Sequence, residues 1–226
     1  MKKIIIAIDG PAASGKSTTA KLVASKLNYL HIDTGAMYRA MALKVLRNKI
    51  SPDDAASIAH LTETTTVRLV FREDKKSVDI LLDNEVVNDE IRTLEVTNIV
   101  SNVSIVPEVR IRMVDAQRAM GAEGGIVLEG RDIGTVVFPN AELKIFMVAN
   151  PRERAKRRLK ELNEKNISVT LEDLEREILE RDMIDSNREL SPLKKADDAF
   201  VLDTTNLSIE EQVEVIVEKA KKIIGG

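Results

Sequence analysis

The chain has 226 residues, 43% of them hydrophobic and 31% charged, which fits one folded domain with small insertions and excludes a disordered chain. Lys and Arg number 34 against 37 Asp and Glu, so the chain lacks the basic surplus usual in proteins whose main ligand is a nucleic acid. The absence of cysteine excludes disulfides, thiolate catalysis and zinc–thiolate sites, and two histidines are too few for a His-rich metal site.

A short apolar run opens the chain at residues 4–8 and stops at Asp9. The run is too short for the apolar region of a secretory signal, and no stretch approaches the ~18 apolar residues of a membrane span. It is typical of a buried strand in a parallel sheet. We therefore expect a cytoplasmic protein with no membrane partner.

The residues directly after Asp9 read GPAASGKST and match the phosphate-binding pattern G-x-x-x-x-G-K-[ST]. Glycines allow a tight turn whose N–H groups point at phosphate oxygens, Lys16 would reach the β- and γ-phosphates, and the Ser17 hydroxyl would bind Mg²⁺. The next residues have helical spacing, so the loop opens onto a helix N-terminus, which favours anions. We predict that nucleotide phosphates bind the loop residues Gly10, Pro11, Ala12, Ala13, Ser14, Gly15, Lys16, Ser17 and Thr18.

Apolar runs alternate with helical patterns along the rest of the chain. Buried strands are predicted at residues 4–8, 30–32, 126–128, 143–148 and 199–202. Helix starts are indicated at Ser51-Pro52 and Asn150-Pro151, and by a capping box from Ser208 to Glu211. This alternation predicts an open, doubly wound α/β sheet covered on both faces.

Residues 66–87, TVRLVFREDKKSVDILLDNEVV, break this rhythm. They contain two or three alternating β segments, with polar turns expected at 72–76 and 83–84. The pattern predicts a small antiparallel insertion between two helical regions.

The phosphate-binding loop alone does not identify the class of nucleotide protein. The guanine-reading motif N-K-x-D is absent, no second ATPase core is present, and the chain is too short and too acidic for a typical helicase. A compact phosphotransferase remains, and its acceptor site must be found among three stretches.

The first stretch, HIDTGAMYRAM at residues 31–41, follows the second predicted strand. Thr34 and Gly35 mark a helix entry, with Arg39 soon after, and strand ends are where an open α/β sheet places its ligand. The alternative interpretation is a helix cap and a surface arginine.

The second stretch, IVLEGRDIGTVVFP at residues 126–139, places Arg131 and Asp132 between two glycines after a buried strand. Small neighbours permit a ligand to approach closely, although the two charges could also tie down the loop as a pair.

In the third stretch, ERDMIDSNREL at residues 180–190, Arg181, Asp185 and Arg188 would share one face of a helix at i, i+4 and i+7. Solvated ion pairs are the alternative here, and such pairs contribute little to stability.

Together, GPAASGKSTTAK, DTGAMYRA, EGRDIGTVVFP and RDMIDSNR, in this order and spacing, resemble the bacterial cytidylate kinases, the (d)CMP kinases. The likeness runs from about residue 3 to 220 and includes the β-rich insertion, which this family carries in its monophosphate-binding region. It implies one P-loop kinase domain over residues 1–226, with a five-stranded parallel sheet, the insertion at about 63–100 and a helical lid at about 150–170. We expect a monomer.

The resemblance also implies the reaction and the site. ATP would donate its γ-phosphoryl group to CMP or dCMP with Mg²⁺, giving ADP and CDP or dCDP. Arg39, Arg131 and Arg188 would surround the CMP phosphate and the transferring group, and Arg181 and Asp185 would hold the ribose hydroxyls. Thr34 stands where some relatives have Ser and keeps the hydroxyl.

Ser101 and Arg110 match family positions that read cytosine together with Asp132, although spacing alone singles out neither of the first two. A carboxylate accepts a hydrogen bond from the N4 amino group of cytosine, whereas uracil presents an acceptor there. Asp132 would therefore favour CMP over UMP. This disfavours UMP as a substrate but leaves it open.

The run NPRERAKRRLKEL at residues 150–162 carries four arginines. A charged run is usually a solvated helix face, and two of the four are expected to be so. The resemblance places the run in the mobile lid that closes over ATP and excludes water. We expect Arg157 and Arg158 to reach the phosphates.

Two rival interpretations remain open: a monophosphate kinase of different base choice, and a P-loop protein that binds nucleotide as a regulator or assembly component. A panel of nucleoside monophosphates separates the first rival from a CMP kinase, and ATP binding without ADP formation would favour the second.

Overall fold

The structure is a computed structural model that describes residues 2–72, 77–121, 123–164 and 167–225. The chain divides into two compact units, which we call unit 1 (Met1–Leu30 with Gly124–Gly226) and unit 2 (His31–Glu123). The organisation expected from the sequence, one kinase domain over 1–226 with an insertion at about 63–100 and a lid at about 150–170, stays a prediction.

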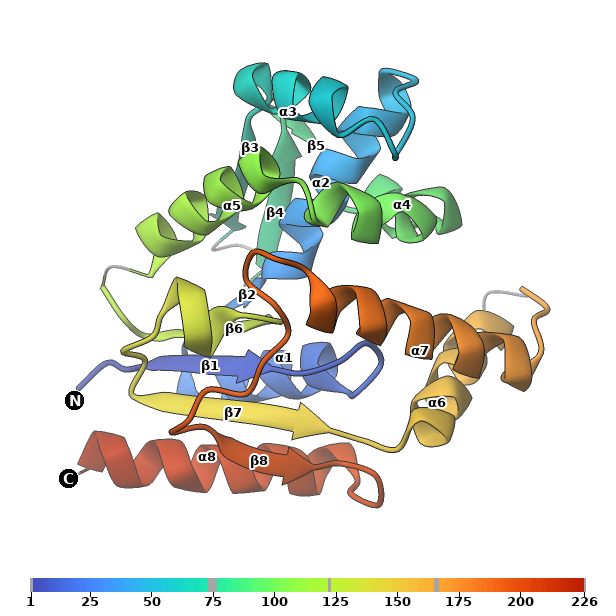
Figure 1. Ribbon diagram of the computed structural model, residues 1–226. Coiled ribbons are helices and arrows are strands. Elements are labelled where there is room, and N and C mark those ends of the chain that lie inside the picture. Colours follow the sequence, from blue (N-terminus) through green and yellow to red (C-terminus); the bar gives the residue numbers. More distant parts are fainter. Residues whose placement is uncertain (1, 73–76, 122, 165–166, 226) are drawn as a thin grey trace. The chain divides into compact units, whose positions relative to one another are not determined.

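A five-stranded parallel sheet contains β1 (Ile5–Asp9), β2 (Leu30–Asp33), β6 (Ile126–Gly130), β7 (Leu143–Val148) and β8 (Phe200–Asp203). Its strand order is β2-β6-β1-β7-β8, which puts β1 in the centre (Figure 1). In the pairing of β1 with β6, Asp9 is opposite Gly130, so both strands end at the same edge. The predicted α/β fold and its five strands are confirmed.

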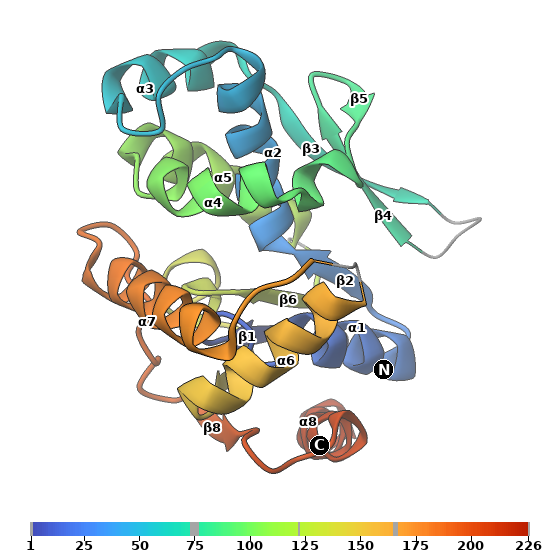
Figure 2. The same ribbon diagram turned by 90° about the vertical axis from the view of Figure 1, so that its right-hand side faces the viewer.

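The described residues of unit 1 also form the helices α1 (Lys16–Leu27), α6 (Pro151–Asn163), α7 (Leu171–Asn187) and α8 (Ile209–Gly225). Helix α1 packs against α8, and α6 packs against α7 as a helical pair (Figure 2). Between β6 and β7 the chain forms a short π-helix, η2 (Ile133–Val137). Apolar residues of the strands, α1 and α8, such as Ile6, Val23 and Ile216, form the main core of this unit.

Unit 2 combines helices with a small antiparallel sheet. Its helices are α2 (Thr34–Arg47), α3 (Ala55–Thr64), the 3₁₀-helix η1 (Glu90–Arg92), α4 (Leu94–Ser104) and α5 (Pro107–Met120). The sheet has the order β3-β4-β5, from β3 (Val67–Arg72), β4 (Ser77–Leu82) and β5 (Glu85–Val86). The predicted antiparallel insertion is confirmed, and its core includes Met37, Met41 and Ile91.

The predicted turn at 83–84 is also confirmed, because Asp83 and Asn84 both have positive φ angles, 50° and 72°, as a tight hairpin turn requires. The other predicted turn, at 72–76, lies outside the described residues except for Arg72.

Two of the three predicted helix starts are confirmed. Asn150 caps α6 by accepting from the Arg152 N–H at 2.9 Å, and the backbone N–H of Ser208 donates to Glu211 Oε2 at 2.8 Å in the capping box of α8. Among the helices of the described residues, none is long and apolar enough to cross a bilayer.

The start predicted at Ser51 is wrong, because Asp54 is the N-cap of α3. The Asp54 carboxylate accepts from both the backbone N–H (3.0 Å) and the hydroxyl (2.7 Å) of Ser57. A carboxylate can accept both bonds at once, whereas a serine hydroxyl has a single oxygen to offer. Ser51 instead begins the turn that precedes the helix, and its carbonyl accepts from the Asp54 N–H.

Candidate functional site: a phosphate-binding loop and an arginine–carboxylate cluster

The loop predicted to bind phosphate lies between β1 and α1 in unit 1. Gly10 and Gly15 have φ angles of 151° and 95°, a backbone conformation that residues with a side chain rarely adopt. A Cβ on Gly10 would lie 2.3 Å from the Met147 carbonyl oxygen, so glycine is needed there for close packing against β7. Gly15 is the N-cap of α1, so the loop runs directly into the helix N-terminus as the motif predicts.

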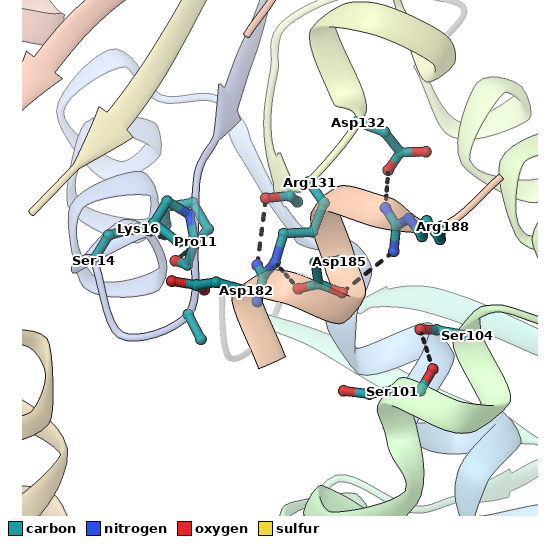
Figure 3. A network of polar contacts seen from close by, with 12 residues as sticks. Pro11, Ser14, Lys16, Ser101, Ser104, Arg131, Asp132, Asp182, Asp185 and Arg188 are labelled. Carbon is teal, nitrogen blue, oxygen red and sulfur yellow. Dashed lines mark hydrogen bonds and ion pairs between the residues drawn. The ribbon is translucent and has the colours of Figure 1, made fainter. Parts of the chain in front are cut away.

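Lys16, the first residue of α1, is buried beneath this loop. Its Nζ donates to the Pro11 carbonyl at 2.6 Å and to Ser14 Oγ at 3.3 Å (Figure 3). The pKa of Lys16 is lowered to about 7, because burial and the charge of Arg131 lower it more than Glu129 raises it. An anion placed beside this amine would restore its charge.

Ser17 and Glu129 bring oxygen ligands together at the start of α1. The Ser17 hydroxyl donates to Glu129 Oε2 at 2.6 Å, and Glu129, near the end of β6, is buried. Mg²⁺ prefers such oxygen donors and usually takes its remaining ligands from phosphates and water. Within the residues that the structure describes, no group of three or more His, Cys, Asp or Glu side chains could hold a metal ion by itself. These two residues therefore fit a magnesium ion that arrives with nucleotide phosphates.

The outward carbonyls of the loop are held by residues distant in the sequence. The Thr204 hydroxyl donates to the Ser14 carbonyl at 2.9 Å, and Arg157 Nη1 donates to the same carbonyl at 3.3 Å. Arg154 Nη1 donates to the Ala12 carbonyl at 3.2 Å and pairs with Asp182 Oδ2 at 2.6 Å. The backbone of the loop is thereby tied to the residue that follows β8 and to the helical pair α6–α7.

The arginines of α6 divide differently from the expectation that grouped Arg157 with Arg158. Arg158 pairs with Glu161 on its own helix at 3.0 Å, and Arg152 is a half-exposed partner of α7 carboxylates. The two arginines that contact the loop are Arg154 and Arg157. Which arginines meet ATP stays a prediction.

A second group of charges lies where β6 ends and α7 ends. Arg131 Nε donates to Asp185 Oδ2 at 2.7 Å, and Arg188 Nη1 lies 3.5 Å from Asp185 Oδ1 (Figure 3). Arg188 Nη2 lies 4.0 Å from Asp132 Oδ1. Asp185 thus joins two arginines, and we call Arg131, Asp132, Asp185 and Arg188 the arginine–carboxylate cluster.

The placing of Arg188 corrects one expectation from the sequence. Helix α7 ends at Asn187, and Arg188 is its C-cap with an extended backbone, φ −65° and ψ 143°. Its guanidinium is held by the Ser191 carbonyl, at 2.6 Å from Nε, as well as by Asp185. It therefore meets Asp185 across the helix end and not along a helical face.

Within the cluster, Asp185 and Arg131 each stabilise the charged form of the other. Burial raises the pKa of Asp185, but Arg131, Arg181 and Arg188 outweigh it, and the pKa ends below its usual value. The pKa of Arg131 is raised, because Asp185 outweighs the desolvation that opposes it. The charges of Asp185 and Arg131 are thus present whether or not a ligand binds.

The other predicted acceptor residues lie in unit 2. Arg39 on α2 donates from Nη1 to Thr97 Oγ1 at 2.8 Å. Arg110 on α5 donates to the Ser104 carbonyl at 3.2 Å, and its guanidinium lies over the Tyr38 ring, 5.1 Å from the centroid. These contacts fix the direction of both arginines within their own unit.

The remaining two predicted residues of unit 2 are Thr34, buried as the first residue of α2, and Ser101 on α4. The Ser101 carbonyl accepts from the hydroxyl of Ser104 at 2.9 Å (Figure 3).

Several residues of unit 1 near the loop have no functional motif in the sequence. Asp9 ends a predicted strand, Thr204 follows another, and Asp182 is one acidic residue among many on α7. Their position at or near strand ends was the one available signal, because the carboxyl edge of a parallel sheet is where ligands bind.

Comparisons with known proteins agree with this geometry. Residues 6–222 match the family model described as cytidylate kinase. The chain is 54% identical to a cytidylate kinase of Chloroherpeton thalassium, over 99% of this chain and 95% of the relative, and 50% identical to one of Clostridioides difficile, over 97% and 99%.

Among solved structures, a gluconokinase of Sinorhizobium meliloti is similar with a TM-score of 0.50 at 12% identity, covering 99% of this chain and 95% of the other. That likeness shows the kinase fold alone. The family match over almost the whole chain goes further, and the chain belongs to the cytidylate kinases, a family of ATP-dependent nucleoside monophosphate kinases.

Proposed function

We propose that the loop and the arginine–carboxylate cluster carry out the reaction of the family, transfer of the γ-phosphoryl group of ATP to CMP or dCMP. The observation that carries the proposal is the position of Lys16 and Arg131 in one unit, close enough that the charge of Arg131 lowers the pKa of Lys16. Lys16, whose pKa is lowered to about 7, would regain its charge when phosphate anions bind beside it.

On the donor side, the loop residues 10–18 would bind the ATP phosphates. Lys16 would exchange its bonds to Pro11 and Ser14 for the β- and γ-phosphates. Ser17, with Glu129 nearby, would hold Mg²⁺. When bound, this ion neutralises phosphate charge and orients the β- and γ-oxygens.

On the acceptor side, Arg39, Arg131 and Arg188 would bind the monophosphate, and Arg181 with Asp185 would bind the ribose. A phosphate oxygen of CMP attacks the γ-phosphorus, the bond from that phosphorus to the β–γ bridging oxygen breaks, and ADP leaves with the electron pair. The attacking oxygen is already ionised, so no general base is required. Positioning and charge neutralisation supply most of the catalysis.

Base choice would depend on Asp132, Ser101 and Arg110, with Thr34 as a further hydroxyl contact. The Asp132 carboxylate accepts a hydrogen bond from cytosine N4, where uracil presents an oxygen. A buried acceptor left unpaired by the wrong base discriminates strongly.

Lid closure over ATP by α6 would exclude water and so suppress hydrolysis. Arg157 and Arg158 are the proposed phosphate contacts of the lid, and Arg154 joins them as a candidate because it already contacts the loop. We further propose a cytoplasmic monomer, which sedimentation of the purified chain would test.

The experiment that tests the function is ADP release with ATP, Mg²⁺ and a panel of CMP, dCMP, UMP, AMP and GMP. We expect rapid turnover with CMP or dCMP and slow turnover with the rest. Turnover on UMP without turnover on CMP would overturn the proposed base reading. ATP binding with no ADP release on any monophosphate would instead favour a regulatory P-loop protein.

A further inference from the structure

Asp9 is a buried carboxylate at the end of β1 whose two oxygens both bind the turn after β6. Its Oδ1 accepts from the Ile133 N–H at 2.8 Å and its Oδ2 from the Gly134 N–H at 2.7 Å. Only 4% of Asp9 is exposed. These bonds join residues more than 120 positions apart in the chain, and the turn that they hold begins with Arg131 and Asp132.

The first N–H groups of a helix have no partner within the helix, and an aspartate at the N-cap usually accepts from them with its own side chain. Asp132 is the N-cap of η2, yet its side chain makes no capping bond. Asp9 accepts from those N–H groups instead. The Asp132 carboxylate lies toward Arg188, at 4.0 Å.

The surroundings of this contact are closely fitted. A Cβ on Gly134 would lie 3.2 Å from Lys144 Cδ, so the Lys144 stem packs closely against this turn. Lys144 is held in turn by Asp198, with Nζ–Oδ2 2.8 Å. The turn therefore has Asp9 at its start and the Lys144 stem along its side.

The charge on Asp9 matters for this contact. The pKa of Asp9 is raised to about 6, mainly by burial and also by the charge of Asp132. The N–H groups of Gly134 and Ile133 and the charge of Lys16 act in the opposite direction. At neutral pH the group is ionised and accepts both bonds. Protonation would turn one oxygen into a donor that faces an N–H group.

We propose that Asp9 is a positioning residue: by capping η2 in place of Asp132, it keeps the Asp132 carboxylate directed at the acceptor base. This inference rests on the proposed base reading by Asp132. It assigns to the residue before the phosphate-binding loop a role in acceptor choice, and no direct contact with substrate is needed.

The first test is Asp9→Asn in the full chain. The amide keeps one acceptor, but its NH₂ group faces a backbone N–H, so η2 loses one cap and Asp132 is the nearest replacement. We expect the preference for CMP over UMP, measured as the ratio of the two kcat/KM values, to fall by about tenfold. A factor of that size corresponds to the net contribution of about one hydrogen bond. ATP is kept saturating in this assay, because Asp9 is one of the charges that raise the pKa of Lys16 and its loss would weaken ATP binding. That effect is common to both acceptors and does not alter their ratio.

A double-mutant cycle with Asp132→Asn shows whether Asp9 acts through Asp132. If it does, the Asp9→Asn substitution should change the CMP/UMP ratio by less than about twofold once Asp132→Asn is present. Independent effects that multiply in the double variant would overturn the proposal. So would an Asp9→Asn enzyme with an unchanged ratio.

Asp198→Asn is the matched control, because it removes a carboxylate that borders the same turn through Lys144 without altering the cap. It should keep the CMP/UMP ratio of the parent. If Asp9→Asn does not fold, Asp9→Ser replaces it, since the small hydroxyl accepts one N–H and should lower the ratio in the same direction. A parent enzyme inactive on CMP would refute the proposed function itself, whereas an active parent with unaltered Asp9 variants refutes only this inference.

Discussion

The phosphate-binding loop and the arginine–carboxylate cluster handle positive charge in opposite ways. Lys16 donates to neutral oxygens of its own loop, and burial lowers its pKa to about 7. Arg131 donates to the carboxylate of Asp185, and its pKa is raised. The loop therefore depends on the phosphates that it binds for negative charge, whereas the cluster contains its own counter-charge.

Removing the amine of the loop tests the first half of the comparison and should have the largest effect. With Lys16→Met, kcat/KM should fall by about 10³-fold, because one positioned donor at a developing charge contributes on this scale. Steady-state ADP release measures it, with the circular dichroism spectrum as a check on the fold. Lys21→Met, an exposed position on the same helix, should keep parental activity. A residual activity near that of the parent would mean that phosphate charge is neutralised elsewhere.

Removing the counter-charge of the cluster tests the second half. Asp185→Asn leaves Arg131 buried beside an uncharged amide, so the free energy of unfolding should fall by about 3 kcal/mol in denaturant melts at pH 7. The kcat/KM for CMP should fall by about 100-fold, because a buried charge left without its partner misplaces the arginines that bind the acceptor.

The pH dependence of stability adds a check on Asp185. Its folded pKa is lowered, so its contribution is complete above the usual aspartate value of 3.8 and disappears as the pH falls through the folded value. The variant should therefore lose less stability than the parent on acidification below about pH 4. Asp173→Asn, an exposed change on the same helix, should leave CMP kinetics unaltered. Equal behaviour of the two variants would show that the ion pair is dispensable.

The smallest expected effect concerns protons taken up with ATP. The unbound Lys16 is mostly neutral above pH 7, and phosphates raise its pKa again, so binding at pH 8 should take up close to one proton per ATP. Affinity should weaken by up to about tenfold per pH unit above 7. Calorimetry in two buffers of different ionisation enthalpy measures the uptake, and Lys16→Met should abolish it. Equal heats in both buffers at pH 8 would contradict the contrast drawn between the two regions.

The sequence predicts the loop and the sheet well because their signals are local. The motif from Gly10 to Ser17 is contiguous, and buried parallel strands are short apolar runs. The chain therefore reveals both the strands and the edge at which they end.

The cluster is less predictable because its pairings join distant segments. Adjacent Arg131 and Asp132 suggested a pair, but Arg131 contacts Asp185 and Asp132 approaches Arg188. Helical spacing placed Arg188 on α7, but the helix ends one residue earlier. A periodic pattern locates a helix face but not its last residue.

The sequence likewise does not indicate which arginines of α6 are buried and which are exposed. Arg154 is 3% exposed and contacts the loop, whereas its neighbour Arg152 is solvated. Ser101 and Arg110 were found only through family resemblance, because a polar residue on a helix has no pattern that separates a binding role from a solvated one. The role of Asp9 has no signal in the sequence either, because its two partners follow a strand far along the chain.

The ties on the outside of the phosphate-binding loop have a thermodynamic consequence. Thr204, Arg154 and Arg157 already occupy carbonyls of Ala12 and Ser14. The conformational entropy of arranging these peptides is therefore lost when the chain folds, and ATP need not supply it on arrival. An incoming nucleotide meets a rigid anion receptor, so its association entropy should contain little contribution from the loop backbone.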